Sequence, residues 1–469
     1  MAKIIFEEVK DQLTELIKKH QHKVDYLEIR LEEKEKEFID IEKEGLQNIG
    51  SLNRVGGCVR TCYKGGWGFA SFASLDRMEE MLEKASDISK LIGNDRTHLA
   101  EVEPVVDRVK ANITCDPRDV PLQEKLQLLN AYIDRIQAYP SERIQSCGAN
   151  YTEEFVQKIF FNSEGSMIQQ EFMAMDLMLK AISFHAGEQT PMFEIMNNTH
   201  DFNFFRNREN VIEQICERAH LFSDAITPKG GEYPVILDAH MAGTFAHESF
   251  GHTSEADLFA SSPGGAEILK LGKRFGGEML NIYDTGDMLE YAGNLVYDDE
   301  GVVAERTDLL RDGILVGRMH SRATAAQFAE KPTGNARAVS YQYPPIVRMR
   351  NTCIAIGKNT FEELLSDIKV GVYAQGLYGG HGGENFSFIP ARGYMIRDGK
   401  LAEPVKNFSL SGNLFASLME INGVTGAQDF KTLAASGDNG GCGKFEQFPL
   451  SVGMSAPQIR FRKMNVGGC

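Results

Sequence analysis

The chain has 469 residues, of which 42% are hydrophobic and 25% charged, and its formal net charge is −16. This composition is that of a globular protein with enough length for two domains. The acidic balance argues against a nucleic-acid partner, which needs a basic surface. No apolar run reaches the length of a membrane span, so we expect no membrane partner either.

Two further features predict where the protein works. The N-terminus carries Glu7 and Glu8 where a signal peptide would have an apolar core, which predicts a cytoplasmic protein. The eight cysteines are scattered without a disulfide rhythm, and Cys58 and Cys62 lack a second pair at zinc-ribbon spacing, so we interpret these two as structural.

The first half of the chain alternates helical and strand-like patterns. Apolar residues recur at helical spacing in some segments and alternate with polar ones in others. The helices are expected at 6–19, 75–92, 121–138 and 207–222, and the strands at 25–33, 38–42, 58–63, 143–151, 156–162 and 167–184. These elements predict a mixed α/β domain over residues 1–226.

A turn-rich segment at 227–234, rich in Gly and Pro, predicts a domain boundary. A short strand at 235–237 and a helix at 239–258 follow it. Strand-length apolar segments then alternate with turns at 295–297, 314–319, 370–373 and 393–397, and Thr360 with Glu363 forms a capping box for a short helix. Residues 233–469 are therefore predicted to form a β-rich, barrel-like domain, and the whole chain an α+β protein.

The helix at 239–258 contains the sequence His247-Glu248-Ser-Phe-Gly-His252. Two histidines and a glutamate are the residues that zinc hydrolases use as metal ligands and general base, usually as H-E-x-x-H. Here the histidines are five apart, and on a regular α-helix they would point about 140° away from each other. A π-type turn brings such residues back over one another, and such turns cluster at functional sites. We therefore predict a π-bulge over 246–252, with Gly251 tolerating the irregular backbone.

A catalytic zinc commonly has a third protein ligand. The candidates are Glu255, Asp257, His240, His320, His381 and the cysteines. Cys442 stands out because it lies in a glycine-dense segment, 437–443, that could approach a buried ion closely, and because a thiolate is a good zinc ligand. A buried structural cysteine is the alternative interpretation.

The chain resembles the TldD/PmbA family of metalloproteases, and in particular its zinc-carrying, TldD-like members. The resemblance runs through an ordered set of short motifs along nearly the whole chain. These are Gly56–Arg60, Gly65–Ser71, Asn162–Gly165, Thr333–Arg337, Pro344–Pro345, Arg348–Thr352, Gly383–Phe388, Gly412–Asn413, Cys442–Lys444 and Val466–Gly468, besides His247–His252. Thr253, Ser254 and Ala256 depart from the glycine and hydrophobic residues expected after the second histidine, and Gly264–Gly265 differ too, which bears on substrate preference.

The resemblance implies one Zn²⁺ per chain, or another divalent metal, held by His247, His252 and Cys442, with Glu248 as catalytic acid/base. It also implies a dimer, either a homodimer or a heterodimer with a metal-free paralogue, around an enclosed cavity that admits unfolded or small peptides. The glycine run at 376–383 is expected to line the substrate channel, with His381 on its surface.

Three functions remain open from the sequence. The preferred one is a zinc-dependent peptidase. The second is a metal-dependent hydrolase of a non-peptide amide, which would use the same ligands. The third is a non-catalytic scaffold subunit, against which the intact Glu248 argues, because a structural zinc site has no use for a general base.

Overall fold

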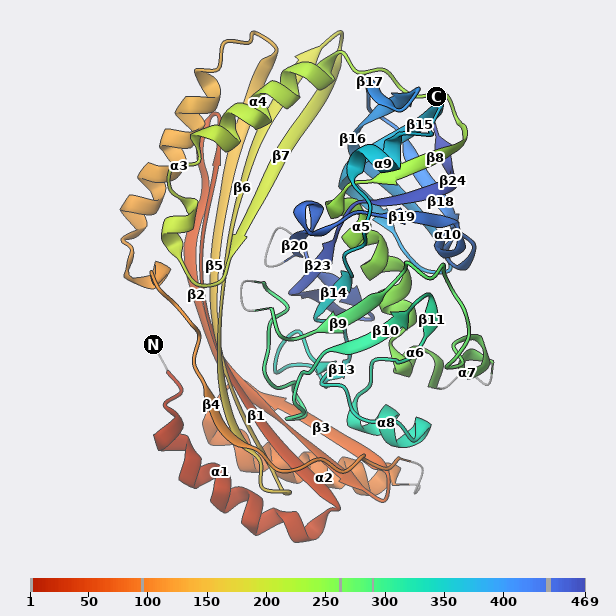
Figure 1. Ribbon diagram of the computed structural model, residues 1–469. Helices are drawn as coiled ribbons and strands as arrows, with labels where there is room; N and C mark the ends of the chain where they lie inside the picture. The colour runs from red at the N-terminus through yellow and green to blue at the C-terminus, as the bar shows by residue number, and fades with distance from the viewer. Residues whose placement is uncertain (1–2, 94–96, 261–263, 289–290, 436–439, 469) are drawn as a thin grey trace.

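The computed structural model describes residues 3–93, 97–260, 264–288, 291–435 and 440–468. The N-terminal part is built on one large, curved sheet (Figure 1). Its strand order is β3-β2-β1-β5-β6-β4, and β7 pairs with β6. These strands are β1 (Tyr26–Glu42), β2 (Gly45–Tyr63), β3 (Gly66–Phe72), β4 (Val106–Val109), β5 (Ile144–Asn162), β6 (Met167–His185) and β7 (Glu188–Asn198).

Four helices cover one face of this sheet in two pairs (Figure 1). Apolar residues of α1 (Phe6–His20) and α2 (Met78–Ile92) share a core with β1, β2 and β3. Those of α3 (Leu122–Gln137) and α4 (Glu209–Ser223) share a second core with β5, β6 and β7. The connections include the short helices η1 (Gln21–Lys23), η2 (Leu75–Arg77), η3 (Pro117–Asp119) and η4 (Phe202–Phe205). The other face of the sheet is turned toward the C-terminal part (Figure 1).

The C-terminal part contains a closed barrel of five strands. Their order is β15-β8-β24-β18-β16, and β16 pairs back to β15. The barrel strands are β8 (Gly231–Leu237), β15 (Val370–His381), β16 (Asn385–Arg397), β18 (Ser409–Asn413) and β24 (Ile459–Gly467), with β17 (Lys400–Val405) and β19 (Ile421–Val424) attached. This closure confirms the barrel-like expectation and the α+β class.

A second C-terminal sheet has the order β11-β10-β9-β14-β23-β20. Its strands are β9 (Ile282–Thr285), β10 (Thr307–Arg311), β11 (Ile314–Leu315), β14 (Asn351–Ile354), β20 (Lys431–Ala435) and β23 (Val452–Ala456). Two ribbons complete the strands, β12 (Ala336–Arg337) with β13 (Ile346–Val347), and β21 (Cys442–Lys444) with β22 (Gln447–Leu450). The helices are α5 (Ala239–Phe245), η5 (Ala246–Gly251), α6 (Ala256–Ala260), α7 (Gly265–Ile268), α8 (Arg322–Phe328), α9 (Phe361–Leu365), α10 (Leu414–Glu420) and η6 (Ala427–Asp429).

Several element boundaries differ from the sequence predictions. The segments 25–33 and 38–42 form one continuous strand, because β1 pairs along its length with both β2 and β5. The segment 295–297 is not a strand and makes only an isolated bridge at Tyr297. The predicted helix at 239–258 stops near His252, because Ser254 and Ala256 exchange main-chain hydrogen bonds with Met319. The capping box of Thr360 and Glu363 is confirmed.

Two further sequence predictions concern the organisation of the chain. The division at 1–226 and 233–469 stays a prediction, although strands β1 to β7 form one sheet and β8 begins the barrel. Among the described residues, no helix combines the length and the apolar composition that crossing a membrane would need.

Candidate metal centre

The helix that carries the HExxxH motif begins regularly and then widens. Asp238 caps α5, its side chain accepting a hydrogen bond from the Met241 main-chain N–H at 2.8 Å. The α-helix passes directly into the π-helix η5 over Ala246–Gly251. The wider turn brings the rings of His247 and His252 together, with centroids 5.3 Å apart. The predicted π-bulge is therefore confirmed, and it resolves the mismatch between a five-residue spacing and a single metal.

Gly251 leaves room for Met349 at the C-terminal end of the π-turn. A Cβ added there would lie 2.1 Å from the Met349 sulfur. We expect Gly251→Ala to destabilise the protein by about 1–3 kcal/mol, because the well-packed Met349 has to shift. Chemical denaturation measures this, with Gly264→Ala as control, since a Cβ at Gly264 meets nothing within 4 Å. Combining Gly251→Ala with Met349→Ala is expected to recover part of the loss, and a loss that persists unchanged would point to backbone strain instead.

The hairpin of β21 and β22 brings Cys442 to the two histidines from 190 residues further along the chain. One ligand atom from each of His247, His252 and Cys442 lies within 4.8 Å of the others. The Cys442 Sγ is 3.4 Å from the His252 Nε2. Buried Arg348 fixes the hairpin by donating a hydrogen bond to the Cys442 carbonyl at 2.7 Å.

This donor set fits a zinc ion. Tetrahedral zinc with its usual bond lengths separates a sulfur from a nitrogen ligand by about 3.6 Å, close to the distance found. Burial by itself raises the pKa of the Cys442 thiol, but His247 and His252 beside it lower that pKa to about 5, which favours the thiolate that a metal requires. His247 Nδ1 is buried and has no hydrogen-bond partner among the described residues. Three donors leave a position open for water, as in catalytic rather than structural sites.

Glu255, one of the alternative third ligands, contacts His252 from the other side. Its fully buried carboxylate is 3.1 Å from His252 Nδ1. A carboxylate in this place holds a metal-ligating histidine in one orientation and tautomer, leaving Nε2 free for the metal. Burial raises the pKa of Glu255, but His252 and Lys444 outweigh it and lower that pKa.

Lys444, which was not among the predicted site residues, completes this support. Its ammonium group is 3.0 Å from Glu255 and 2.5 Å from Asp257, and it donates to the Val347 carbonyl at 2.8 Å. Lys444 lies two residues after Cys442 on the same short strand, and both residues are buried while Gly443 between them is exposed. That spacing was the available signal for it. Asp257 is thus a partner of Lys444 and is not among the residues clustered around the two histidines.

Removing the Glu255 carboxylate is expected to weaken metal binding by about 10- to 100-fold, because His252 loses the group that orients it. The measurement is competition with a chromophoric chelator on Glu255→Ala. Asp257→Ala is the matched control, since it removes a partner of Lys444 without touching His252. Equal effects from the two substitutions, or an unfolding midpoint lowered only in Glu255→Ala, would contradict an orienting role.

Glu248 follows the first histidine directly on the π-turn and is half-buried. The tip of the β15–β16 hairpin lies against it. A Cβ added at Gly382 would be 2.6 Å from the Glu248 Cβ and 2.3 Å from its carbonyl oxygen. The glycine run at 376–383 therefore packs against Glu248. That this segment lines a substrate channel stays a prediction.

The other histidine candidates lie elsewhere. His320 is buried against Glu330 and Thr324, with its Nε2 3.0 Å from the Glu330 carboxylate. His381 is exposed on β15. His240 lines a cavity of about 460 Å³ between β7, α4 and the start of α5. Of the glycine segment before Cys442, residues 436–439 lie outside the described residues.

Comparison with known proteins supports the resemblance to the TldD/PmbA family along nearly the whole chain. Family models described as PmbA/TldA metallopeptidase domain 1, central domain and C-terminal domain match residues 27–89, 115–221 and 230–468. A metalloprotease of Synechocystis is 38% identical over 462 residues, which are 98% of each chain. A protein of Saccharolobus solfataricus named zinc metalloprotease TldD homolog is 30% identical over 416 residues, covering 87% of this chain and 89% of the relative.

A solved structure supports the fold. That of TldE from Thermococcus kodakarensis superposes with a TM-score of 0.75 at 17% identity, covering 97% of this chain and all of that one. At this identity the likeness concerns the architecture alone. With three matching domain models and a relative 38% identical over nearly its full length, the chain belongs to the PmbA/TldD metallopeptidase family.

Proposed function

We propose that this protein is a zinc-dependent peptidase that hydrolyses unfolded or small peptides. The observation that carries the proposal is the cluster of His247, His252 and Cys442 on a π-turn, with Glu248 next to the first ligand. The name of the Saccharolobus relative includes zinc, and the donor set of two imidazoles and a thiolate suits that metal.

His247, His252 and Cys442 would hold the metal. Bound zinc would supply a Lewis acid that brings the pKa of its water toward neutrality and polarises the scissile carbonyl. Glu248 takes the proton from the attacking water and passes it to the leaving amine nitrogen. Glu255 and Lys444 keep His252 in place during these steps, and Gly382 leaves room for the Glu248 backbone against the β15–β16 hairpin.

The experiment that tests this function is mass-spectrometric analysis of a pool of unstructured peptides incubated with the protein. We expect the protein to cleave the peptides. Cleavage should be lost when a chelator removes the metal and should recover when zinc is added back. If a folded, zinc-loaded protein leaves the peptides intact, the proposal is contradicted. The hydrolysis of a non-peptide amide, which the same residues could perform, would then be the favoured function.

We further propose that the protein acts as a dimer in the cytoplasm, with itself or with a metal-free paralogue, around an enclosed cavity. The support for this proposal is that the chain belongs to the family. TldE is a structurally similar chain. Light scattering of the purified protein gives the mass of the assembly. A monomer that cleaves peptides at full rate would contradict the dimer.

A further inference from the structure

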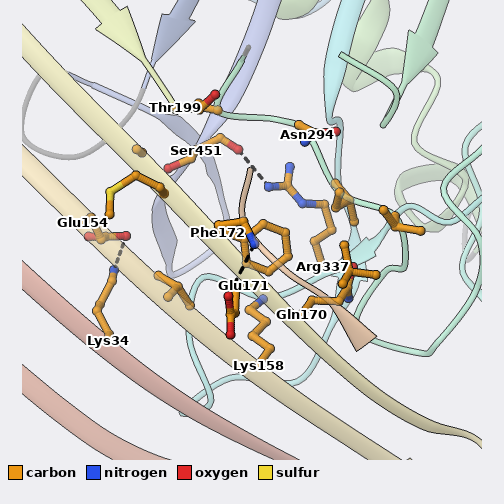
Figure 2. Close-up of a pocket in the computed structure, with 18 of the residues that line it drawn as sticks. Lys34, Glu154, Lys158, Gln170, Glu171, Phe172, Thr199, Asn294, Arg337 and Ser451 are labelled. Atoms are coloured by element: carbon orange, nitrogen blue, oxygen red, sulfur yellow. Dashed lines mark hydrogen bonds and ion pairs between the residues drawn. The ribbon is translucent and has the colours of Figure 1, made fainter. Parts of the chain in front are cut away.

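A second cavity, apart from the metal ligands, lies between the N-terminal sheet and the C-terminal part. It has a volume of about 190 Å³. One wall comes from the N-terminal sheet, with Lys158 on β5 and Gln170 and Phe172 on β6. The opposite wall comes from C-terminal segments that include Asn294, Arg337 and Ser451, and Figure 2 shows the Arg337 side chain among these residues.

Arg337 is a cation without a carboxylate partner. Its guanidinium group donates hydrogen bonds to the main-chain carbonyls of Met349, at 2.5 Å, and Ser451, at 2.8 Å. It forms no ion pair with any residue that the structure describes. Burial, and after it the nearby Arg348, lower the pKa of Arg337 to about 10, so its positive charge is poorly compensated.

The acidic residues of the cavity compensate this charge only in part: Asp299 raises the pKa of Arg337, but each of these residues has other partners. Glu154 is paired with Lys34 at 2.8 Å, and Asp299 with Lys158 at 2.8 Å and Arg30 at 3.1 Å. On the N-terminal wall, Glu171 accepts a hydrogen bond from the Ala111 main chain, and Glu32 lies in the field of Lys158, Arg30 and Lys34. The unpaired charge on the C-terminal wall is therefore positive.

Two neutral donors lie on the same wall as Arg337. The Asn294 side-chain amide and the Ser451 hydroxyl have no hydrogen-bond partner among the described residues. The guanidinium, the amide and the hydroxyl all belong to residues that line one cavity, and together they form a set of donors that suits a carboxylate.

The cavity adjoins the metal centre through the segments that Arg337 holds. Ser451 follows Leu450, which is the cross-strand partner of the ligand Cys442. Met349 packs its sulfur against Gly251 at the end of the π-turn. One strand spacing, from Leu450 to Cys442, and the hydrogen bond from Arg337 to the Ser451 carbonyl place the guanidinium on the order of 10 Å from the metal ligands. An extended peptide covers that distance in about three residues.

Building on the proposed peptidase function, we propose that Arg337, Asn294 and Ser451 bind the C-terminal carboxylate of the substrate. The peptide bond presented to Glu248 and the metal ligands is then one a few residues from the end of the chain. The enzyme thus acts preferentially on free C-terminal ends and releases short C-terminal fragments.

The test measures binding separately from turnover, using the metal-loaded Glu248→Ala variant. The probes are three fluorescein-labelled, unstructured decapeptides: one with a free C-terminal acid, one with a C-terminal amide, and an amide whose last residue is glutamate. Fluorescence anisotropy is expected to show the free acid bound about 10- to 100-fold more tightly than the plain amide, the usual range for a charge-assisted hydrogen bond.

Two further substitutions, each made in the Glu248→Ala variant, identify the residues responsible for the preference for the free acid. Arg337→Gln is expected to remove the preference for the acid. Asn294→Asp, which breaks no hydrogen bond of the protein, is expected to weaken binding of the acid while leaving the amide unchanged, because it places a second negative charge beside the carboxylate. This variant keeps the test decisive if Arg337→Gln fails to fold.

Equal affinities for acid and amide, or a preference that Asn294→Asp leaves intact, would overturn the proposal. An amide ending in glutamate that binds as tightly as the free acid would also overturn it, since the ligand would then be a side chain. A clear preference for the acid in binding, together with no cleavage by the wild-type protein, would support the carboxylate site and contradict only the peptidase function.

Discussion

Glu248→Ala is expected to lower kcat for peptide hydrolysis by about 10²- to 10⁴-fold while the protein keeps its metal. The carboxylate sits on the π-turn next to His247, but it is not one of the three clustered ligand atoms. Its removal therefore takes away the proton acceptor without taking away a ligand. Steady-state kinetics on a peptide cleaved by the wild type, with metal content measured by plasma mass spectrometry, separates the two effects.

The matched control is Glu267→Ala, which removes an exposed glutamate of α7 and should change neither quantity. A Glu248→Ala protein that holds its metal and turns over at nearly the wild-type rate would exclude Glu248 as the general base. One that loses its metal would instead make Glu248 a ligand.

Cys442→Ser is expected to weaken metal binding by about two to three orders of magnitude and to abolish turnover at limiting metal. The thiolate would be one of the three donors that cluster among the described residues, and a serine hydroxyl stays protonated where the Cys442 thiol, with a pKa of about 5, does not. Metal content after dialysis against a weak chelator gives the change in affinity.

Cys115→Ser is the control, because Cys115 is a partly exposed free cysteine outside the metal cluster. Stoichiometric, tightly held metal in Cys442→Ser would show that another residue is the third ligand. Glu255, which already contacts His252, would then be the first to replace in combination with it.

Much of the candidate site was present in the sequence, because it depends on local spacing. A five-residue interval cannot place two histidines on one face of an α-helix, so the motif by itself required the π-turn that is found over Ala246–Gly251. The helix stripes and the capping box at Thr360 follow from equally local rules. The ordered set of short motifs along the chain indicated the family without any knowledge of tertiary contacts.

Other features were decided only by the fold. No local pattern brings Cys442 to within 3.4 Å of His252, since that approach depends on the β21–β22 hairpin and on Arg348 behind it. Glu255 was one candidate ligand among several, and its role as the partner of His252 follows from where the chain turns to pair with Met319. The sequence also could not show that 25–33 and 38–42 belong to one strand. The many charged residues there give little strand propensity, and the strand is stabilised by pairing with β2 and β5.

The sequence by itself thus determined the family and the α+β class and predicted the residues of the candidate metal centre, because side-chain type and helical period are properties of short segments. The tertiary structure alone decided which distant groups complete the site: the hairpin that brings Cys442 to the histidines, the Lys444 that supports Glu255, and the unpaired Arg337 in its cavity. The physical reason is that burial and long-range pairing fix the charge balance around a residue, and neither can be obtained from the residues next to it in the chain.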